Sequence, residues 1–454
     1  LVLKNNKGTE DNRVRKLDYS IQISKIFYER FIKDEEITLF SPNNVPGLYE
    51  AFGMPEFDDL YVKYENNKKI PHSKIRAQTL FMDLLKERAE TGRIYIMNID
   101  HCNTHSSFKD KVYMSNLCQE ITLPTTPLQH IDDNNGEIAL CILSAINLGL
   151  IKEKDELEEL CDLSVRALDE IIDYQEYPVF AAKKSTESRR SLGIGYIGLA
   201  HYLAKNKLKY NDKEALKLVD EVTEAFQYYL LKASNTLAQE KGKCDWFDKT
   251  KYADGILPID TYKKDLDSII KRKLSYDWNT LRQDIKQHGL RHSTLSAQMP
   301  SESSSVVSNA TNGVEPPRDY LSIKKSKKGT LKQIVPDYNR LKNFYTLLWD
   351  MPSNEGYINV ISVMQKYFDQ AISGNWSYNP ENYKDGEVPV SVMANDLLTT
   401  YKLGWKTSYY QNTYDAKADV EEPTHSVGWH DDVKETKEVI INEEDEESCE
   451  ACAI

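Results

Sequence analysis

Helical and strand-like hydrophobic patterns alternate along the chain, and this alternation restricts the fold more than any other feature. Residues 78–90 have the period of a helix that ends at Gly92, and residues 93–98 follow as a strand rich in β-branched and aromatic side chains. Further amphipathic helices are predicted over residues 153–172, 211–242 and 390–403. Alternation of this kind predicts an α/β fold.

Negative charge is concentrated at the C-terminal end. The 454 residues carry a net charge of −13, and the stretch 416–454 holds thirteen acidic residues against three lysines, which is −10 of that total. The near-neutral remainder argues against a nucleic-acid-binding face. Residues 416–447 lack periodic apolar side chains, so we expect a disordered acidic linker there. The final segment, 448–454, carries Cys449 and Cys452.

Neither a membrane span nor secretion is predicted. The best apolar candidate, residues 138–151, is shorter than the about 18 residues that a bilayer requires. The first residues lack the apolar stretch of a secretory signal. Seven cysteines in such a chain fit a reducing compartment, so we expect a cytoplasmic protein. Because Leu1 is not an initiating Met, we also expect further residues before it.

A thiol lies between an amide and a carboxylate in residues 115–120. In extended backbone Asn116, Cys118 and Glu120 would share one face, because residues two apart point the same way. The thiol would then have a hydrogen-bonding group and a base beside it. A buried cysteine next to a surface glutamate is the alternative interpretation of this spacing.

The other cysteines of the first 415 residues give weaker signals. Residues 136–143 are typical of a buried strand, in which Cys141 alone would be a core residue. Cys102 and Cys244 have no partner at metal-ligand spacing, so we predict that the chain binds no metal.

Serines precede a helix-like stretch in residues 299–310. Their hydroxyl groups and the free backbone N–H groups of a helix N-terminus could hold a phosphate. An ordinary helix cap is the other interpretation.

Gly193, Gly195 and Gly198 match the dinucleotide fingerprint G-x-G-x-x-G. The residues before them are charged and do not form a clear strand of a βαβ unit, so the match is weak. We expect a strand-to-helix turn with close backbone packing instead. A nicotinamide-binding dehydrogenase remains an alternative that rests on this motif alone.

Two adjacent tyrosines, Tyr409 and Tyr410, stand just before the acidic stretch. Tyrosine occurs 28 times, and the pair Tyr228-Tyr229 falls within a predicted helix, so a pair by itself means little. The position of the second pair distinguishes it.

Together these segments resemble one family. The motifs, in chain order, are Asn-Leu-Cys-x-Glu at 116–120, Glu-Ile-Ala-Leu-Cys at 137–141, Pro-Ser-Glu-x-Ser-Ser at 300–305, Glu-Pro-Pro-Arg at 315–318 and Tyr-Tyr-Gln-Asn-Thr at 409–413. With the two-cysteine end, the chain resembles the large, catalytic subunit of class I (Ia) ribonucleoside-diphosphate reductases. The resemblance implies that residues 1–415 form most of a ten-stranded α/β barrel with two antiparallel five-stranded halves and a central finger loop.

The resemblance also implies roles in a thiyl-radical reaction. Cys118 would carry the transient radical that removes the ribose 3′ hydrogen. Glu120 would act as base on the 3′ hydroxyl, and Asn116 would bind the substrate. Cys141 would be one of two redox cysteines. The substrate-binding residues would be Asn116, Leu117, Cys118, Gln119, Glu120, Pro300, Ser301, Glu302, Ser303, Ser304 and Ser305, with the serines on the phosphates.

Electron and radical carriers follow from the same resemblance. Tyr409 and Tyr410 would relay a radical to Cys118 from a metal-containing small subunit. Cys449 and Cys452 would re-reduce the buried disulfide and take electrons from thioredoxin or glutaredoxin. The chain itself would bind no cofactor.

Two departures from the family pattern shape the expected assembly. The family places the redox partner of Cys141 on the first barrel strand, and no cysteine before Cys118 fits that place. We therefore expect a C-terminal portion of a large subunit, a fragment or a split-gene product, inactive without an N-terminal large-subunit polypeptide. The alternative is a non-catalytic remnant or a regulatory subunit. The spacing of Cys449 and Cys452 is also closer than in the family, which leaves their redox poise open.

Overall fold

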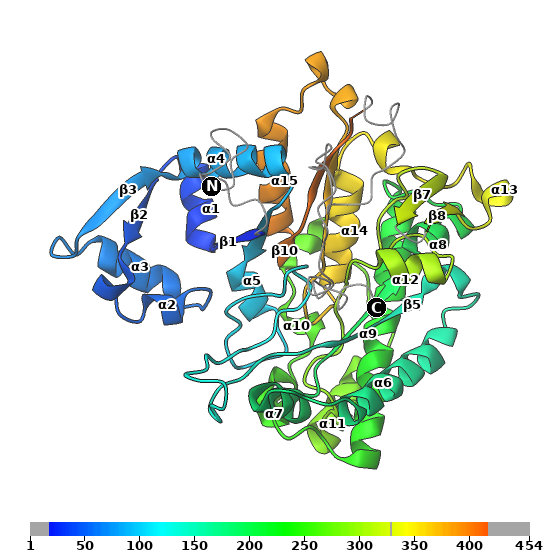
Figure 1. Cartoon of the computed structure of the whole chain (residues 1–454), viewed down its shortest axis with the longest axis horizontal. Helices are drawn as coiled ribbons and strands as arrows, with labels where there is room; N and C mark the ends of the chain where they lie inside the picture. The colour runs from blue at the N-terminus through cyan, green and yellow to red at the C-terminus, as the bar shows by residue number, and fades with distance from the viewer. Residues whose placement is uncertain (1–17, 327–328, 416–454) are drawn as a thin grey trace, which may run out of the picture.

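The computed structural model describes residues 18–326 and 329–415 (Figure 1). The predicted acidic linker 416–447 and the two-cysteine end 448–454 lie outside the described residues. Helices and strands alternate through the described chain, which confirms the predicted α/β class.

The strands are short. They are β1 (Tyr19–Ile23), β2 (Glu36–Phe40), β3 (His72–Arg76), β4 (Ile94–Asn98), β5 (Ile142–Asn147), β6 (Leu192–Ile197), β7 (Leu321–Ser326), β8 (Gly329–Ile334), β9 (Trp376–Tyr378), β10 (Thr407–Ser408) and β11 (Gln411–Thr413). They form one three-stranded and four two-stranded sheets in the described part of the chain.

The helices account for most of the regular structure. They are α1 (Lys25–Lys33), α2 (Leu48–Ala51), α3 (Phe57–Glu65), α4 (Ala77–Thr91), α5 (Ile99–Thr104), α6 (Glu156–Tyr174), α7 (Phe180–Arg189), α8 (Leu199–Lys205), α9 (Lys213–Lys241), α10 (Pro258–Thr261), α11 (Trp278–His288), α12 (Glu302–Val307), α13 (Tyr338–Leu341), α14 (Glu355–Gln365) and α15 (Val390–Lys402).

Seven extended segments lie side by side, and we call them the strand arc. In spatial order they are β5, β6, residues 295–298, residues 371–374, β10, β4 and β1. β5 and β6 are parallel, as are β1 and β4, whereas β10 runs antiparallel to β4. Isolated bridges from Ile194 to Ser296 and from Gln298 to Ile372 join the middle segments.

The strand arc corrects the expectation of a nearly complete barrel. Closure gives every strand two neighbours. Within the described residues β1 and β5 each pair on one side only, so the arc stays open at these two edges. The described residues therefore form an α/β arc rather than a closed ten-stranded barrel.

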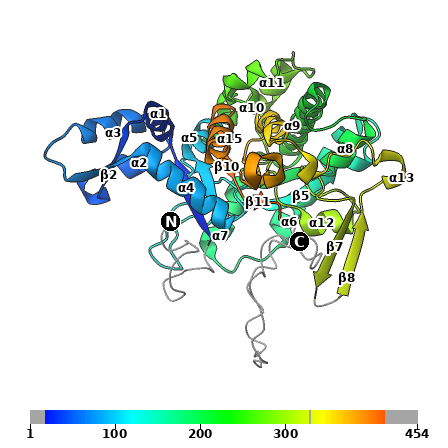
Figure 2. The same cartoon turned by 90° about the horizontal axis from the view of Figure 1, so that it is seen from above.

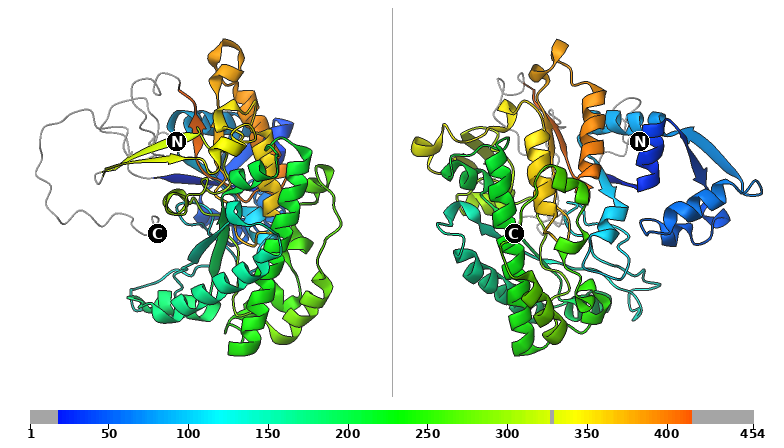
Figure 3. Two further views of the ribbon diagram at one scale, coloured as in Figure 1. Left: turned by 90° about the vertical axis from the view of Figure 1, so that its right-hand side faces the viewer. Right: turned by 180° about the vertical axis from the view of Figure 1, so that it is seen from behind.

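Helices pack around this arc and enclose the main core. The longest, α9, packs against α6, α11 and α14 and is the long green helix in the lower part of the view from behind (Figure 3). The sequence pattern predicts a buried stripe of Leu218, Val222, Phe226, Tyr229 and Ala233 on this helix; the last four are buried, and Leu218 is partly buried against the same core. A fully buried side chain of the size of valine or phenylalanine contributes about 2 kcal/mol of transfer free energy.

Two antiparallel strand pairs extend from the body. β2 and β3, with α2 and α3, form a small lobe beside it and have a separate hydrophobic cluster that includes Phe57 and Tyr61 (Figure 1). β7 and β8 project on another side, as the view from above shows (Figure 2).

Candidate active site

Cys118 lies at the tip of a tight turn. The backbone N–H of Asn116 donates to Ile121 O at 3.1 Å, and that of Gln119 donates to Asn116 O at 3.2 Å. Gln119 has a φ of +72°, in the left-handed region. The expectation of extended backbone here is therefore wrong. A turn, not strand alternation, brings Asn116, Cys118 and Glu120 to one place.

Two residues of the strand arc, Ala371 and Ser373, bind this turn. Ala371 donates its backbone N–H to Glu120 O at 2.9 Å. The Ser373 hydroxyl bonds Cys118 O and lies 3.1 Å from Glu120 Oε2. These bonds fix the thiol and the carboxylate relative to each other.

Glu120 is almost completely buried, with 2% of its surface exposed. Burial raises the pKa of its carboxyl, although hydrogen bonds from Asn116 and Ser373 favour the ionised form. A carboxylate with this environment is a stronger base than an exposed glutamate, and this suits proton abstraction.

The Tyr409 hydroxyl reaches the thiol. Its oxygen lies 3.4 Å from Cys118 Sγ, and both residues are buried. Burial raises the pKa of the Tyr409 phenol, with further increases from Cys118 and Tyr95. The phenol therefore keeps its proton near neutral pH.

Tyr410 lies against Tyr409 and is less buried. The two ring centroids are 4.2 Å apart, and the ring planes are inclined by 60°. The two rings lead from the protein surface to the buried Cys118 thiol, because Tyr410 is partly exposed whereas Tyr409 is 6% exposed.

Tyr95 is a third aromatic ring that the sequence analysis missed. Its centroid is 4.7 Å from that of Tyr409 and 5.3 Å from that of Tyr410. The register explains the contact: β10 pairs Ser408 with Ile96, so the next residue faces Tyr95. The predicted strand 93–98 contained this tyrosine, but only the long-range pairing shows which residues it meets.

Cys141 lies just before β5, so the predicted strand begins later than expected. The side-chain amide of Gln370 donates to Cys141 Sγ at 3.5 Å and to Leu192 O at 2.9 Å. Gln370 Oε1 also accepts from Thr122 N, beyond the Cys118 turn. Burial raises the pKa of the Cys141 thiol, and the nearby Glu120 charge raises it further. The thiol is therefore protonated near neutral pH.

The glycine motif serves packing. A Cβ on Gly193 would lie 2.9 Å from Cys141 Sγ, and one on Gly195 would lie 2.7 Å from Ala297 O. Gly198 has a φ of +77° and directly precedes α8. The expected strand-to-helix turn with close backbone approach is confirmed, and the space beside these glycines is filled by the chain itself.

Residues 300–305, which we call the serine segment, form the turn before the short helix α12 and the first part of that helix. Ser301 and Ser305 are buried, whereas Pro300, Ser303 and Ser304 are exposed and Glu302 is half-buried. The segment begins two residues after Gln298, whose carbonyl accepts the Ser373 N–H at 3.0 Å. Ser373 thus connects the turn of Cys118 to the start of the serine segment. Leu117, at the exposed side of the turn, is 40% exposed, and Gln119 is buried.

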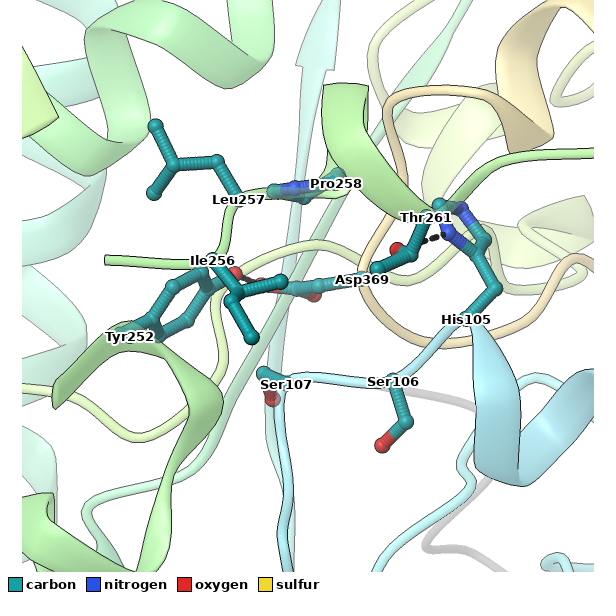
Figure 4. Close-up of a pocket in the computed structure, with 9 residues that line it drawn as sticks. All are labelled: His105, Ser106, Ser107, Tyr252, Ile256, Leu257, Pro258, Thr261 and Asp369. Carbon is teal, nitrogen blue, oxygen red and sulfur yellow. Dashed lines mark hydrogen bonds between the residues drawn. The ribbon is translucent and has the colours of Figure 1, made fainter. Parts of the chain in front are cut away.

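A small pocket lies beside Asp369 (Figure 4). It is lined by His105, Ser106, Ser107, Tyr252, Ile256, Leu257, Pro258, Thr261 and Asp369. Asp369 accepts the Tyr252 hydroxyl at 2.8 Å and the backbone N–H groups of Leu295 and Ser296. These bonds tie the pocket to residues 295 and 296 of the strand arc. None of the residues that line the pocket is a predicted site residue.

Three further predictions concern metal binding, a membrane span and the C-terminal cysteines. In residues 18–326 and 329–415, no group of His, Cys, Asp and Glu side chains is arranged to hold a metal ion. None of the helices in the same ranges is long and apolar enough to cross a membrane. Cys449 and Cys452 lie outside the described residues.

Comparison with known proteins gives consistent matches. A family model described as the ribonucleotide reductase barrel domain matches residues 1–411. Relatives include the ribonucleoside-diphosphate reductase subunit alpha of Haemophilus influenzae (60% identical over 427 residues), the ribonucleoside-diphosphate reductase 1 subunit alpha of Escherichia coli (58% over 427) and the subunit alpha of Enterobacteria phage T4 (43% over 425). These matches cover 91% to 93% of this chain and 56% of each relative. The chain thus spans just over half the length of these relatives.

Proposed function

The chain belongs to the ribonucleotide reductase barrel family, and we propose that it carries the catalytic centre of a ribonucleoside-diphosphate reductase alpha subunit. The observation that carries the proposal is the Tyr409 hydroxyl 3.4 Å from Cys118 Sγ, with Tyr410 packed behind it. A redox-active phenol in contact with a buried thiol suits hydrogen-atom transfer, because the proton and the electron move over the same short distance.

The first step forms the thiyl radical. A radical on Tyr410 takes a hydrogen atom from Tyr409, and the Tyr409 radical takes one from Cys118. Each transfer moves one proton and one electron, so Tyr409–O• and Cys118–SH become Tyr409–OH and Cys118–S•. The raised pKa of the Tyr409 phenol supports this coupled transfer, since the phenol does not lose its proton beforehand.

The second step acts on the ribose. The Cys118 radical takes the 3′ hydrogen atom, and Glu120 accepts the proton of the 3′ hydroxyl. The 2′ hydroxyl leaves as water with a proton from a thiol. Cys141 and a second thiol supply two electrons and become a disulfide, and their remaining hydrogen goes to C2′. Glu120 returns its proton to the 3′ oxygen, and Cys118 returns the hydrogen atom to C3′. The balance is one ribonucleotide and two thiols giving one deoxyribonucleotide, one disulfide and one water.

The substrate would lie between the Cys118 turn and the serine segment. Asn116 would bind the ribose, and residues 300–305 would hold the phosphates. Ser305 Oγ supports this assignment, because it is buried and has no hydrogen-bond partner among the described residues. A buried hydroxyl group without a partner costs about 1–3 kcal/mol, which a bound oxygen acceptor would offset.

The remaining components would be two other chains and the C-terminal thiols of this chain. A metal-containing small subunit would supply the radical to Tyr410. An N-terminal large-subunit polypeptide would pair with the open edges of the strand arc, close the barrel and bring the thiol partner of Cys141. Cys449 and Cys452 would reduce the buried disulfide with electrons from thioredoxin or glutaredoxin.

The proposal is tested by reconstitution. The chain is mixed with the N-terminal polypeptide and the small subunit, and conversion of CDP to dCDP is measured with dithiothreitol. We expect turnover from the full mixture, none from the chain alone, and none with Cys118→Ser under any reductant, since a tyrosyl radical cannot oxidise a serine hydroxyl. Turnover by the Cys118→Ser complex at the parental rate would refute the radical assignment.

A further inference from the structure

The tyrosine pair requires an irregular backbone, and the structure shows where the irregularity lies. In a regular strand, adjacent side chains point to opposite faces. The Tyr409 and Tyr410 rings instead lie against each other, 4.2 Å apart. β10 ends at Ser408, and β11 begins at Gln411, so the two tyrosines occupy the bend between them.

One buried side chain binds both carbonyl groups of this bend. Arg88, on α4, is fully buried. Its Nη1 donates to Tyr409 O at 2.7 Å, and its Nη2 donates to Tyr410 O at 3.3 Å. Successive carbonyls of a regular strand point in opposite directions, so two that meet at one guanidinium define the bend. Nη1 also donates to Ile94 O, which ties the bend to β4.

The opposite side of the bend is held by another side chain. The Tyr410 backbone N–H donates to Asn375 Oδ1 at 3.1 Å, and the Trp376 N–H donates to Tyr410 O at 2.8 Å. Arg88 stacks over the Trp376 ring at 5.1 Å. The guanidinium, the indole and the bend therefore form one packed unit.

Burial of a charged side chain costs free energy unless other groups compensate the charge. No ion pair joins Arg88 to a carboxylate in the described part of the chain, and its charge is compensated by backbone carbonyls and an aromatic face. Burial lowers the pKa of Arg88 to about 10, so the group is still charged near neutral pH. Only arginine offers several donors in a rigid planar fork that can bind both carbonyls.

We infer that Arg88 is a positioning residue for radical transfer: it sets the bend that places the Tyr410 ring against Tyr409 and the Tyr409 hydroxyl on Cys118. This inference rests on the proposed function. Arg88 contacts neither the substrate nor the reacting atoms, and it acts through the two tyrosines. Its loss impairs hydrogen-atom transfer and leaves the substrate site, formed by other residues, intact.

The test uses Arg88→Lys in the reconstituted complex of this chain, the N-terminal polypeptide and the small subunit. Lysine keeps the charge but replaces the planar fork of two nitrogens by a single ammonium group on a shorter side chain, so the separate contacts of Nη1 with Tyr409 O and Nη2 with Tyr410 O are lost. We expect kcat for CDP to fall by about 100-fold, as for a reacting group displaced by about 1 Å. KM for CDP stays within about two-fold of the parental value, because ground-state binding is unchanged.

Arg189→Lys is the matched control. Arg189 is also buried and stacks on an indole, 4.8 Å over Trp246, but its partners are Glu137 and Asp110. We expect its kcat to stay close to the parental value. Equal kcat values for the two variants, or a rise in KM that accounts for the loss in Arg88→Lys, would overturn the inference.

Asn375→Ala decides the question if Arg88→Lys does not fold or assemble. It removes the hydrogen bond to Tyr410 N from the other side of the bend, so the same fall in kcat at constant KM is expected. Parental kcat in this variant would then overturn the inference. An inactive parent complex would contradict the proposed function itself, which is a separate outcome.

Discussion

At the scale of single residues, burial of Glu120 affects stability and catalysis in opposite directions. The carboxyl is useful as a base because its raised pKa makes it more basic. The same burial makes the ionised form expensive in the folded state, at about 1.4 kcal/mol for each unit of pKa difference. In the proposed reaction Glu120 would therefore contribute to activity while it weakens the fold near neutral pH.

The first prediction follows from this opposition and concerns Glu120→Gln. Because the folded state raises the pKa, the parent is most stable below the unfolded pKa and loses stability as pH rises through the folded pKa. Glutamine has the same shape and does not ionise. We expect the variant to melt at a higher temperature than the parent near pH 8, with no such gain near pH 4, and to lose CDP reduction.

Thermal melts at both pH values check this prediction, with Glu387→Gln at an exposed position as the control. A gain for Glu120→Gln that is equal at both pH values would contradict the linkage argument.

At the residue level, short sequence motifs were sufficient to select side chains that lie near one another in the structure. Asn116, Cys118, Glu120, Tyr409 and Tyr410 do come together, but the reason given for the first three was wrong. Gln119 has a left-handed φ although it is not a glycine, so no local sequence signal predicted the turn.

At the scale of elements, boundaries with local capping signals were predicted well. The predicted helix 78–90 is α4, which ends at Gly92 with a φ of +68°. The predicted helix 211–242 is α9, with Asp212 and Gly242 at its ends. The strand expected over 136–143 is displaced, because β5 is defined by pairing with β6 fifty residues later. Parallel pairing is a long-range property that hydrophobic pattern alone does not locate.

A second prediction belongs to β6. Gly193→Ala would place a Cβ 2.9 Å from Cys141 Sγ and 2.5 Å from Leu143 Cδ2. We expect a loss of about 1–3 kcal/mol in the free energy of unfolding, as for other overpacked sites. We also expect displacement of Cys141 from Gln370, seen as faster alkylation of Cys141 by iodoacetamide.

Gly195→Ala on the same strand is the matched control for Gly193→Ala. Its Cβ would meet Ala297 O at 2.7 Å and would not touch Cys141. Both variants should be destabilised, whereas only Gly193→Ala should change the alkylation rate. Equal alkylation rates would show that Gly193 does not control the position of Cys141.

At the scale of the whole molecule, the strand arc ends at β1 and β5, each of which pairs on one side only within the described residues. The α/β class followed from alternating patterns, and a barrel domain from the family match. The order of the seven segments could not be read from the sequence, because all six contacts between neighbouring segments join residues far apart in the chain.

A third prediction separates the buried thiols from the C-terminal thiols in the reconstituted complex. Cys449→Ser and Cys452→Ser should abolish CDP reduction with thioredoxin but retain much of it with dithiothreitol. A small reductant can diffuse to a buried disulfide, whereas a protein reductant needs a carrier. Rates with the two reductants are compared for each variant. Loss of the dithiothreitol-supported rate would mean that these thiols do more than carry electrons.

The central claim is that the Tyr409 hydroxyl, 3.4 Å from Cys118 Sγ, is the group through which the radical reaches the thiol. The most direct measurement is the amount of dCDP formed in a single turnover by the prereduced complex with Tyr409→Phe, together with the dissociation constant for CDP. Only one hydroxyl is removed, so CDP binding should stay within about two-fold of the parental value while dCDP falls to background. Parental amounts of dCDP from Tyr409→Phe would contradict the account.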